Sequence, residues 1–388
     1  MNLLNKKIKN LPDYPFDRLR SLLSNIKKNS GIIDMSIGQP MHKVPNFVKE
    51  IIYSEKDKWN AYPPILGIPA LQKSYLDWLK TRFNVNKFFD ESNIIPLSGT
   101  REGLFSISMA LNIKKICLPN PFYQVYLGPS LFQSVKKYFL VSNEDNNFSI
   151  DLKKLKLLLK NNQSLVYFCS PSNPQGKIAS YDYLVELVKI VRFYNSVLVV
   201  DECYIDIFYE KIPTGTLEVC YNTGKNLSNI LIFHSLSKRS NAAGLRSGFL
   251  IGDSKIINYY RKLRSYSAPT MPIPIQMASA ELWKDKKHVI ENRNLYKKKV
   301  KYADKVFKDY NLYSSPEAGF FLWLKVKDGE NFTKQLYSKY SIKVMPGKFL
   351  TYDKVPNPGQ DYVRIALVHT EKKNNIGLNK IAKLLYDY

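Results

Sequence analysis

The chain has 388 residues, more than one hydrophobic core usually organises, so we expect two lobes. Hydrophobic residues make up 45% of it and aromatic residues 13%, which excludes a disordered or fibrous chain. The net charge is +25, but only 11 of the 58 basic residues are arginine, and the lysines are scattered along the whole sequence. This scatter favours a codon bias toward lysine and asparagine over a nucleic-acid-binding surface, which stays the alternative.

Cysteine, histidine and apolar patterns bear on metal binding and compartment. The four cysteines show no C-x-x-C pairing and the four histidines no metal-ligand spacing, so we predict buried reduced thiols and no metal. Met1–Asn10 lacks the apolar core of a secretory signal, and no apolar run is long enough to cross a bilayer. We therefore expect a soluble cytoplasmic protein without membrane or nucleic-acid partners.

Residues 1–45 are predicted to form an N-terminal arm, with a short helix near Asp13–Arg20, and to join the smaller lobe. Apolar runs then alternate with helical patterns such as Tyr181–Phe193, which indicates βαβ units. The predicted strands are Lys115–Leu118, Leu165–Cys169, Ser196–Val200, Asn229–Phe233 and Gly248–Ile251. Residues 46–275 thus read as a large α/β domain, a mainly parallel sheet between helices, with ligands at the carboxyl ends of its strands.

The pattern changes near residue 270, where Ala268–Pro274 is a proline-punctuated break. A helix-rich stretch follows from Ile275 to about Tyr310. Three short strands (Gly319–Val326, Ile342–Met345, Tyr362–Val368) and a C-terminal helix near Asn375–Tyr386 complete the chain. Residues 276–388 are therefore predicted to form a smaller α/β domain.

Lys238 lies a few residues after the predicted strand Asn229–Phe233. Ser235 and Ser237 flank it, and Arg246 follows eight residues later. Partial burial beside another cation lowers the pKa of a lysine and frees its amine to form a Schiff base. Hydroxyls and a guanidinium suit a phosphate. A solvated basic turn would explain the lysine alone, but the spacing and neighbours favour a reactive amine.

Two further strand ends carry polar side chains. Asp201 ends an apolar strand, where a protonated pyridine nitrogen would be a suitable partner; a helix N-cap is the alternative. Tyr204, three residues on, is placed to reach a phenolic oxygen on the same ring. Asn173 lies in the turn of Phe168–Gly176, which alone is equally typical of a plain turn.

Three more positions complete the pattern. Gly99 and Thr100 open a predicted helix whose free backbone N–H groups could cradle an anion, although a single glycine is a weak signal. Tyr123 could stack on a flat cofactor or be an ordinary core aromatic. Arg364 lies within an apolar strand and needs a partner, either a substrate carboxylate or a structural ion pair.

These elements, in this order, resemble the class I/II aminotransferases of the pyridoxal 5′-phosphate (PLP) fold type I superfamily over nearly the whole chain. The most specific motif is S-x-S-K with an arginine eight residues after the lysine, joined to the strand-end D-x-x-Y and to N-P-x-G. The resemblance implies PLP as cofactor and a homodimer with both active sites at the interface.

The resemblance also implies roles for individual residues. Lys238, Asp201 and Tyr204 correspond to the catalytic lysine, the partner of the pyridine nitrogen and a partner of the phenolic oxygen. The other implied cofactor contacts are Gly99, Thr100, Arg101, Tyr123, Asn173, Ser235, Ser237, Arg246 and, reaching the neighbouring subunit's phosphate, Tyr62; the implied substrate contacts are Gly38, Asn173 and Arg364.

A narrower resemblance concerns the substrate. Five phrases look like the bacterial N-succinyl-LL-diaminopimelate aminotransferases of lysine biosynthesis: Leu11–Arg20, Ser98–Glu102, Leu118–Tyr126, Ser235–Asn241 and Glu317–Trp323. Ser98 and Ala242-Ala243 depart from the usual pattern of that group. The implied reaction moves an amino group between glutamate/2-oxoglutarate and N-succinyl-LL-2,6-diaminopimelate/N-succinyl-2-amino-6-oxopimelate.

Other substrates and classes stay open from the sequence. The chain could be an aspartate, aromatic or LL-diaminopimelate aminotransferase, a PLP-dependent C–S lyase of the same fold, or a non-enzymatic nucleic-acid binder. Arg101 and Arg239 lie in the matching motifs, and either could contact the far, acidic end of the substrate.

Overall fold

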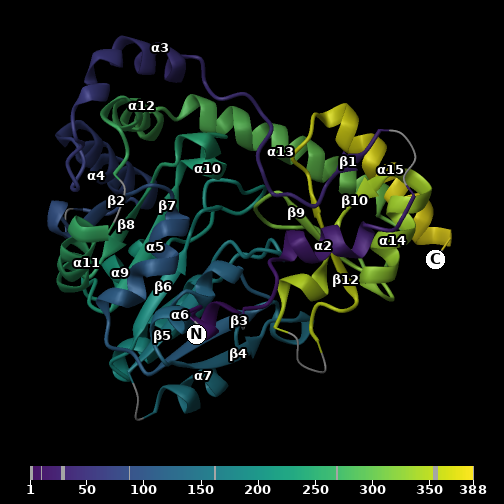
Figure 1. Cartoon of the computed structure of the whole chain (residues 1–388), viewed down its shortest axis with the longest axis horizontal. Coiled ribbons are helices and arrows are strands. Elements are labelled where there is room, and N and C mark those ends of the chain that lie inside the picture. Colours follow the sequence, from purple (N-terminus) through teal and green to yellow (C-terminus); the bar gives the residue numbers. More distant parts are fainter. Residues whose placement is uncertain are drawn as a thin grey trace.

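A seven-stranded sheet runs through the larger lobe in the order β2-β8-β7-β6-β5-β3-β4 (Figure 1). Its strands are β2 (Ile94–Leu97), β3 (Lys115–Asn120), β4 (Lys136–Val141), β5 (Ser164–Cys169), β6 (Val197–Asp201), β7 (Ile230–Ser235) and β8 (Gly248–Gly252). All neighbours pair in parallel except β8, which is antiparallel to β2 and β7. The mainly parallel sheet is confirmed, and each of the five predicted strands is present within two residues at either end.

The two strands that the sequence pattern missed are the edges of the sheet. In β4, Lys136 and Lys137 are exposed, so the strand lacks the continuous apolar run of a central strand. β2 contains Pro96, which an edge strand tolerates because one side of its backbone needs no partner.

The computed structural model describes residues 3–9, 11–27, 31–86, 88–160, 163–267, 270–352 and 357–387. Ala268 and Pro269, where the proline-punctuated break was predicted, lie outside these ranges. No helix within them is long and apolar enough to span a bilayer.

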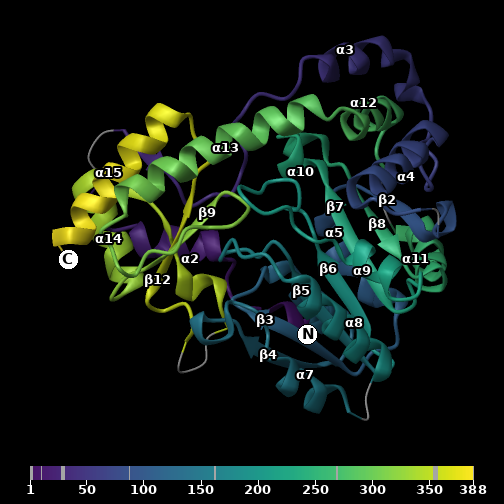
Figure 2. The same cartoon turned by 180° about the vertical axis from the view of Figure 1, so that it is seen from behind.

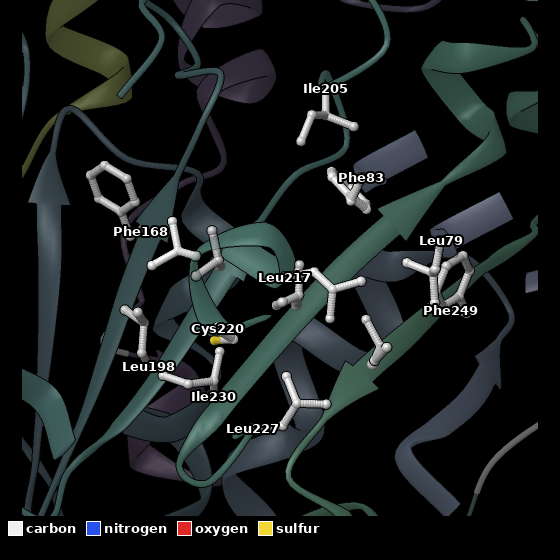
Figure 3. Packing of buried hydrophobic residues seen from close by; sticks show 14 of the residues in the cluster. Leu79, Phe83, Phe168, Leu198, Ile205, Leu217, Cys220, Leu227, Ile230 and Phe249 are labelled. Carbon is white, nitrogen blue, oxygen red and sulfur yellow. The ribbon is translucent and has the colours of Figure 1, made fainter. Parts of the chain in front are cut away.

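Side chains alternate between the two faces of the sheet. In β6, Leu198 and Val200 join one core cluster, whereas Val199 joins another. The first cluster packs against α4 (Pro69–Phe83) and α8 (Tyr181–Phe193), and Figure 3 shows part of it between strands and helices. Helix α8 coincides with its predicted range, and the apolar stripe of its predicted face is buried.

The remaining helices of this lobe are short or cover its rim. They are α3 (Phe47–Ser54), α5 (Thr100–Ser106), α6 (Pro129–Phe132), α7 (Leu152–Leu159), α9 (Thr216–Asn222), α10 (Leu236–Arg239), α11 (Ser254–Ser267) and α12 (Ile273–Lys284), with the N-terminal α1 (Lys6–Lys9) beside α6. Because α5 and α10 follow directly from the region of β2 and β7, both begin at the ligand-binding edge of the sheet.

The smaller lobe contains two small sheets. One is antiparallel in the order β11 (Met345–Pro346), β12 (Tyr362–Ala366), β9 (Phe321–Lys325), and the other pairs β1 (Ile33–Asp34) with β10 (Ile342–Lys343) in parallel. Helices α2 (Pro15–Leu23), α14 (Gly329–Tyr340) and α15 (Glu371–Asp387) belong to this lobe. The long α13 (Lys287–Val306) runs from one lobe to the other (Figure 2).

The predicted domain boundary, between residues 275 and 276, falls inside α12. This helix packs against α3 and α4, and its Ala278, Leu282 and Trp283 belong to the core of the sheet lobe. We therefore propose that the large domain extends to the end of α12 and that the change of lobe occurs along α13.

Candidate active site

A cavity of about 650 Å³ opens between the lobes at the carboxyl ends of β5, β6 and β7. Of the predicted site residues, all except Gly99 and Tyr62 line it: Gly38, Thr100, Arg101, Tyr123, Asn173, Asp201, Tyr204, Ser235, Ser237, Lys238, Arg246 and Arg364. A second cavity, of about 1060 Å³, contains none of them. The sequence motifs, spread over more than 300 positions, therefore converge on one place.

Lys238 is presented by the short helix α10. Ser235 ends β7 and caps this helix, because its Oγ accepts a hydrogen bond from the backbone N–H of Ser237 at 3.1 Å. The Nζ atom of Lys238 donates to the carbonyl oxygen of Gly38, which comes from the N-terminal segment. The amine is thus held at the cavity wall between segments far apart in the sequence.

Burial lowers the pKa of Lys238 to about 8. The charges of Arg364 and Arg246 act in the same direction, whereas Cys203 and Asp201 act against it. A lysine with this pKa is in part an uncharged amine near neutral pH, as nucleophilic or proton-transfer chemistry requires.

Asp201 is a buried carboxylate whose hydrogen-bond donors are neutral. The hydroxyl of Tyr126 donates to its Oδ2 at 2.8 Å, and the backbone N–H of Cys203 donates to its Oδ1 at 3.2 Å. Its side chain is in no ion pair with another described residue, and burial raises its pKa. A cationic N–H group entering the cavity would supply the missing countercharge.

Gly99 and Arg246 form a close contact that only glycine allows. Gly99 has a φ of +81°, and a Cβ atom there would lie 2.2 Å from Nη2 of Arg246. The guanidinium donates to the carbonyl of Ala243 at 2.9 Å, and Thr100 begins α5 beside it. With the hydroxyls of Ser235 and Ser237 on the same cavity, this arrangement suits a phosphate.

Arg364 on β12 is held by neutral acceptors. It donates to Oδ1 of Asn173 at 3.2 Å and to the carbonyl of Ser36 at 2.8 Å, and its guanidinium lies 4.3 Å from the centre of the Phe321 ring. Its Nε is buried without an acceptor, and burial lowers its pKa to about 10. No carboxylate among the described residues forms an ion pair with it, so the alternative of a structural ion pair is not found; a substrate carboxylate would complete its bonding.

Arg101 lies at the cavity wall between two phenols. Its Nε donates to the hydroxyl of Tyr123 at 2.9 Å, and its Nη2 donates to that of Tyr14 at 3.2 Å. Tyr204 is buried on the same cavity, with its ring edge-on to Phe320. The guanidinium of Arg101 therefore has a defined orientation although it is bound only by neutral groups.

Arg239 does not reach the cavity, so its suggested contact with substrate is wrong. It is buried, its Nε pairs with Oδ2 of Asp206 at 2.9 Å, and its Nη1 donates to the carbonyl of Leu282 at 2.6 Å. Arg239 therefore points away from the cavity and connects Asp206 to the end of α12. Tyr62 is fully exposed and also lies off the cavity.

Three cavity residues that were assigned no role from the sequence form hydrogen bonds to predicted site residues. Tyr126 and Cys203 bond to Asp201, and Tyr14 bonds to Arg101. Tyr14 and Tyr126 lie within Leu11–Arg20 and Leu118–Tyr126, two of the segments that carry the family resemblance. The only usable signal for Tyr126 was its place three residues after Tyr123, which brings both rings to one side of a 3₁₀ turn.

Glu202, next to Asp201, is a buried acid outside the cavity lining. Its Oε1 accepts from the backbone N–H of Thr216 at 2.7 Å, and its Oε2 lies 3.7 Å from Nε2 of His234. Burial raises the pKa of Glu202 to about 7 and lowers that of His234 to about 3. Near pH 6 both groups are therefore largely neutral in the folded chain.

We expect Glu202→Gln to remove a pH-dependent loss of stability. The folded chain holds the Glu202 proton more tightly than the unfolded chain, whose pKa is near 4.5, so its stabilisation is complete below pH 4.5 and is lost as the pH rises through 7. The loss is about 3 kcal/mol, at about 1.4 kcal/mol per pKa unit. Urea unfolding at pH 5 and pH 8 should show a smaller decline in the variant; equal declines would contradict the assignment.

Comparisons with known proteins identify the family and the fold. The profile of the family "Aminotransferase class I and II" matches residues 30–381. The crystal structure of an aminotransferase from Neisseria meningitidis Z2491 is similar, with a TM-score of 0.92 and 35% identity over 98% of this chain and 100% of that chain. An LL-diaminopimelate aminotransferase of Dehalococcoides mccartyi (strain ATCC BAA-2266 / KCTC 15142 / 195) is 26% identical over 98% of both chains. The transaminase OxyQ of Streptomyces rimosus, named for 4-dedimethylamino-4-oxo-anhydrotetracycline, is 28% identical over 94% of this chain and 98% of its own.

Proposed function

Since the chain belongs to the class I and II aminotransferase family, we propose that it moves an amino group between glutamate/2-oxoglutarate and N-succinyl-LL-2,6-diaminopimelate/N-succinyl-2-amino-6-oxopimelate, a reaction of lysine biosynthesis. Family, fold and PLP dependence agree with the expectations from the motifs. The succinylated substrate is the proposed part, and the charges around the cavity support it.

Class I and II aminotransferases of this fold use PLP, which supplies an electron sink for negative charge developing on the substrate. The residues present fit this group. The buried Asp201, bonded only by neutral donors, would hold the proton of the pyridine nitrogen. Gly99 leaves room for Arg246, which would bind the phosphate with Thr100 and Ser235.

The protein's own groups then account for binding and proton transfer. Arg364 would bind the α-carboxylate of the amino donor through its guanidinium fork, fixing the Cα–H bond relative to Lys238. With its pKa lowered to about 8, the Nζ of Lys238 can accept the proton that leaves the substrate Cα and hold it for return in the same catalytic cycle. Asp201 would keep its negative charge next to the pyridine nitrogen throughout, because its carboxylate is buried and held by the hydrogen bond from Tyr126.

The charges of the cavity lining support the succinylated substrate over free LL-diaminopimelate. Arg101, Gln39 and Gln124 line this cavity, and the only carboxylate among its described lining residues is the buried Asp201. An N-succinyl group converts the distal ammonium of diaminopimelate into a neutral amide and adds a carboxylate. The distal end of the succinylated molecule is therefore anionic, which suits Arg101 and needs no acidic partner.

A second candidate substrate is LL-diaminopimelate itself. Several relatives at 26–28% identity, each covered over 97% or more, carry the name LL-diaminopimelate aminotransferase. Its distal ammonium would need an acidic partner, which the described lining of one chain lacks. A neighbouring subunit could supply one, so the two substrates must be separated by measurement.

The test compares both diamino acids as amino donors to 2-oxoglutarate. We expect kcat/KM for N-succinyl-LL-diaminopimelate to exceed that for LL-diaminopimelate by at least about 30-fold, as a charge-assisted contact of about 2 kcal/mol gives. Arg101→Met should remove most of this difference, whereas Lys298→Met, which changes an exposed lysine on α13, should not. A preference for LL-diaminopimelate would transfer the proposal to the second candidate; activity with neither would overturn both.

We also propose that the enzyme is a homodimer in which Tyr62 reaches the phosphate site of the neighbouring subunit. Tyr62 is fully exposed, and Tyr53 and Trp59 near it in the sequence are also exposed, as expected of a surface that a second subunit covers. Light scattering should give twice the chain mass of 44.9 kDa. Tyr62→Phe should weaken PLP binding without changing that mass; a monomeric, fully active enzyme would overturn the proposal.

A further inference from the structure

Two hydrogen bonds fix Lys238, one to its side chain and one to its backbone. Their partners, Gly38 and Asn292, are not among the predicted catalytic residues. Its side-chain amine donates to the carbonyl of Gly38. Its main-chain carbonyl accepts a hydrogen bond from Nδ2 of Asn292 at 3.2 Å, and the same Nδ2 donates to the carbonyl of Arg239 at 3.1 Å. Asn292 lies on α13, the helix that joins the two lobes, and is only 3% exposed.

Two further side chains continue from Asn292 toward the smaller lobe. The Oδ1 of Asn292 is 2.8 Å from Nδ1 of His42, and Nε2 of His42 is 2.6 Å from Nζ of Lys299. Lys299 also donates to the carbonyl of Leu367, just after β12. His42 follows Gly38 by four residues. The N-terminal segment therefore contacts both the amine of Lys238 and Asn292, which bonds to the backbone carbonyl of Lys238.

The protonated amine of Lys299 determines which atom donates and which accepts in each of these hydrogen bonds. Burial lowers the pKa of Lys299 to about 7, so at pH 6.5 most of this amine is protonated and can only donate, and Nε2 of His42 accepts. The Nδ1 of His42 therefore carries the proton and donates to Oδ1 of Asn292, which also accepts from Asn241 at 3.0 Å. The amide nitrogen of Asn292 must then face the Lys238 and Arg239 carbonyls. Burial and the charge of Lys299 lower the pKa of His42, which keeps this imidazole neutral.

Packing alone does not account for this series of hydrogen-bonded side chains. Lys299 is 2% exposed and forms no ion pair within the described residues, although the charge of Glu371 acts on it beyond ion-pair distance. A buried cation without a carboxylate in direct contact is costly. An apolar side chain at this position of α13 would avoid that cost. Instead, Lys299 bonds to His42, His42 bonds to Asn292, and Asn292 bonds to the backbone carbonyl of Lys238.

We propose that Asn292, oriented by His42 and Lys299, is a positioning residue. It holds the backbone of the turn that carries Lys238, and so keeps the amine of Lys238 at the cavity wall. The proposal rests on the proposed role of Lys238 as the lysine that bonds PLP. It assigns a function to the three residues beyond catalysis and cofactor binding: they connect the N-terminal segment and α13 to the position of the reactive amine.

The first test compares Asn292→Leu with Asn294→Leu, the same change at an exposed site on the same helix. At pH 6.5 we expect kcat with glutamate, per bound PLP, to fall about tenfold in Asn292→Leu, with KM changed less than about twofold. A displacement of about 1 Å can cost about 100-fold in rate, and we expect the loosened turn to move by less than that. The visible absorbance of the bound cofactor should also titrate at higher pH, because a loosened lysine is less buried. Asn294→Leu should match the wild type in both.

A second series keeps the proposal testable if Asn292→Leu does not fold. His42→Asn retains a donor near the Nδ1 position, whereas His42→Leu does not, so the leucine variant should lose activity and the asparagine variant should keep most of it. Lys299→Met should resemble His42→Leu, with Lys298→Met as its exposed control. Lower thermal stability with unchanged kcat and absorbance titration in these variants would mean a structural role only and would overturn the proposal.

Failure of this inference can be told apart from failure of the proposed function. Borohydride reduction of the wild-type holoenzyme followed by peptide mapping identifies the lysine that carries PLP. PLP on another lysine would remove the role of Lys238 and this inference with it. PLP on Lys238 together with unaltered kinetics and titration in Asn292→Leu and His42→Leu would overturn the inference and leave the proposed function intact.

Discussion

Replacing Lys238 with alanine should lower the single-turnover rate with glutamate by about 10³-fold or more, while the chain still folds and binds PLP. General acid–base catalysis contributes about 10²–10⁴-fold, and loss of the covalent link to the cofactor adds to the effect. Binding should survive because the contacts expected from Asp201, Arg246 and Tyr123 remain. Stopped-flow absorbance of the cofactor after mixing with glutamate measures the rate.

Lys298→Ala is the matched control for Lys238→Ala, because it removes an exposed lysine and should react at the wild-type rate. Methylamine should restore part of the activity of Lys238→Ala, since a free amine can occupy the vacated space and move the proton. Near-wild-type turnover of Lys238→Ala without added amine would contradict the assignment of this residue.

The second large effect is expected for Arg364→Met. The guanidinium is buried and bonded to Asn173 and Ser36, and we propose that it binds the α-carboxylate common to all amino donors. Truncating one partner of a buried charge pair costs about 2–5 kcal/mol, so kcat/KM should fall by about 30-fold to 5,000-fold. The fall should be similar for glutamate and alanine, because both carry that carboxylate.

The choice of donors makes the test of Arg364 specific. Arg101→Met should impair glutamate, with its distal carboxylate, more than alanine, whereas Arg364→Met should impair both. Arg364→Lys should recover little, because an ammonium cannot reproduce the two-pronged contact or both hydrogen bonds to neighbours. If Arg364→Met lost activity only with glutamate, the residue would bind the distal carboxylate, and its proposed role would be wrong.

The sequence predicted the large sheet well because its central strands are continuous apolar runs. Residues at the ends of such runs, including Asp201 and Ser235, must meet at one edge of a parallel sheet, so their convergence followed from the order of the motifs. Family resemblance added the roles of these residues, and the comparisons confirm the family, the fold and PLP dependence.

Other features depend on contacts that a local pattern does not contain. The hydrogen bond from Tyr126 to Asp201 spans 75 positions, and that from Arg101 to Tyr14 spans 87. Arg239 stands beside Lys238 in the same motif, yet the helical turn directs it to Asp206 and away from the cavity. Sequence spacing places neighbouring residues in one motif, but only the fold decides which side of a short helix each one takes.

The boundary inside α12 has a similar cause. Proline residues near 270 suggested the end of a domain, because proline often marks a break between elements. Here Pro274 occupies the first turn of α12, where proline fits a helix, and Trp283 packs with Phe249 of β8. From this tertiary packing, which the local signal does not report, we propose that the helix belongs to the sheet lobe.

The most direct test of the account is one spectroscopic cycle of the purified protein with PLP. We predict a visible absorbance band that disappears when glutamate is added and returns when N-succinyl-2-amino-6-oxopimelate is added after removal of the glutamate. This result would establish both halves of amino-group transfer on the proposed substrate. Loss of the band without its return would retain the aminotransferase and refute the succinylated substrate. A protein that stays colourless with added PLP would contradict the central claim.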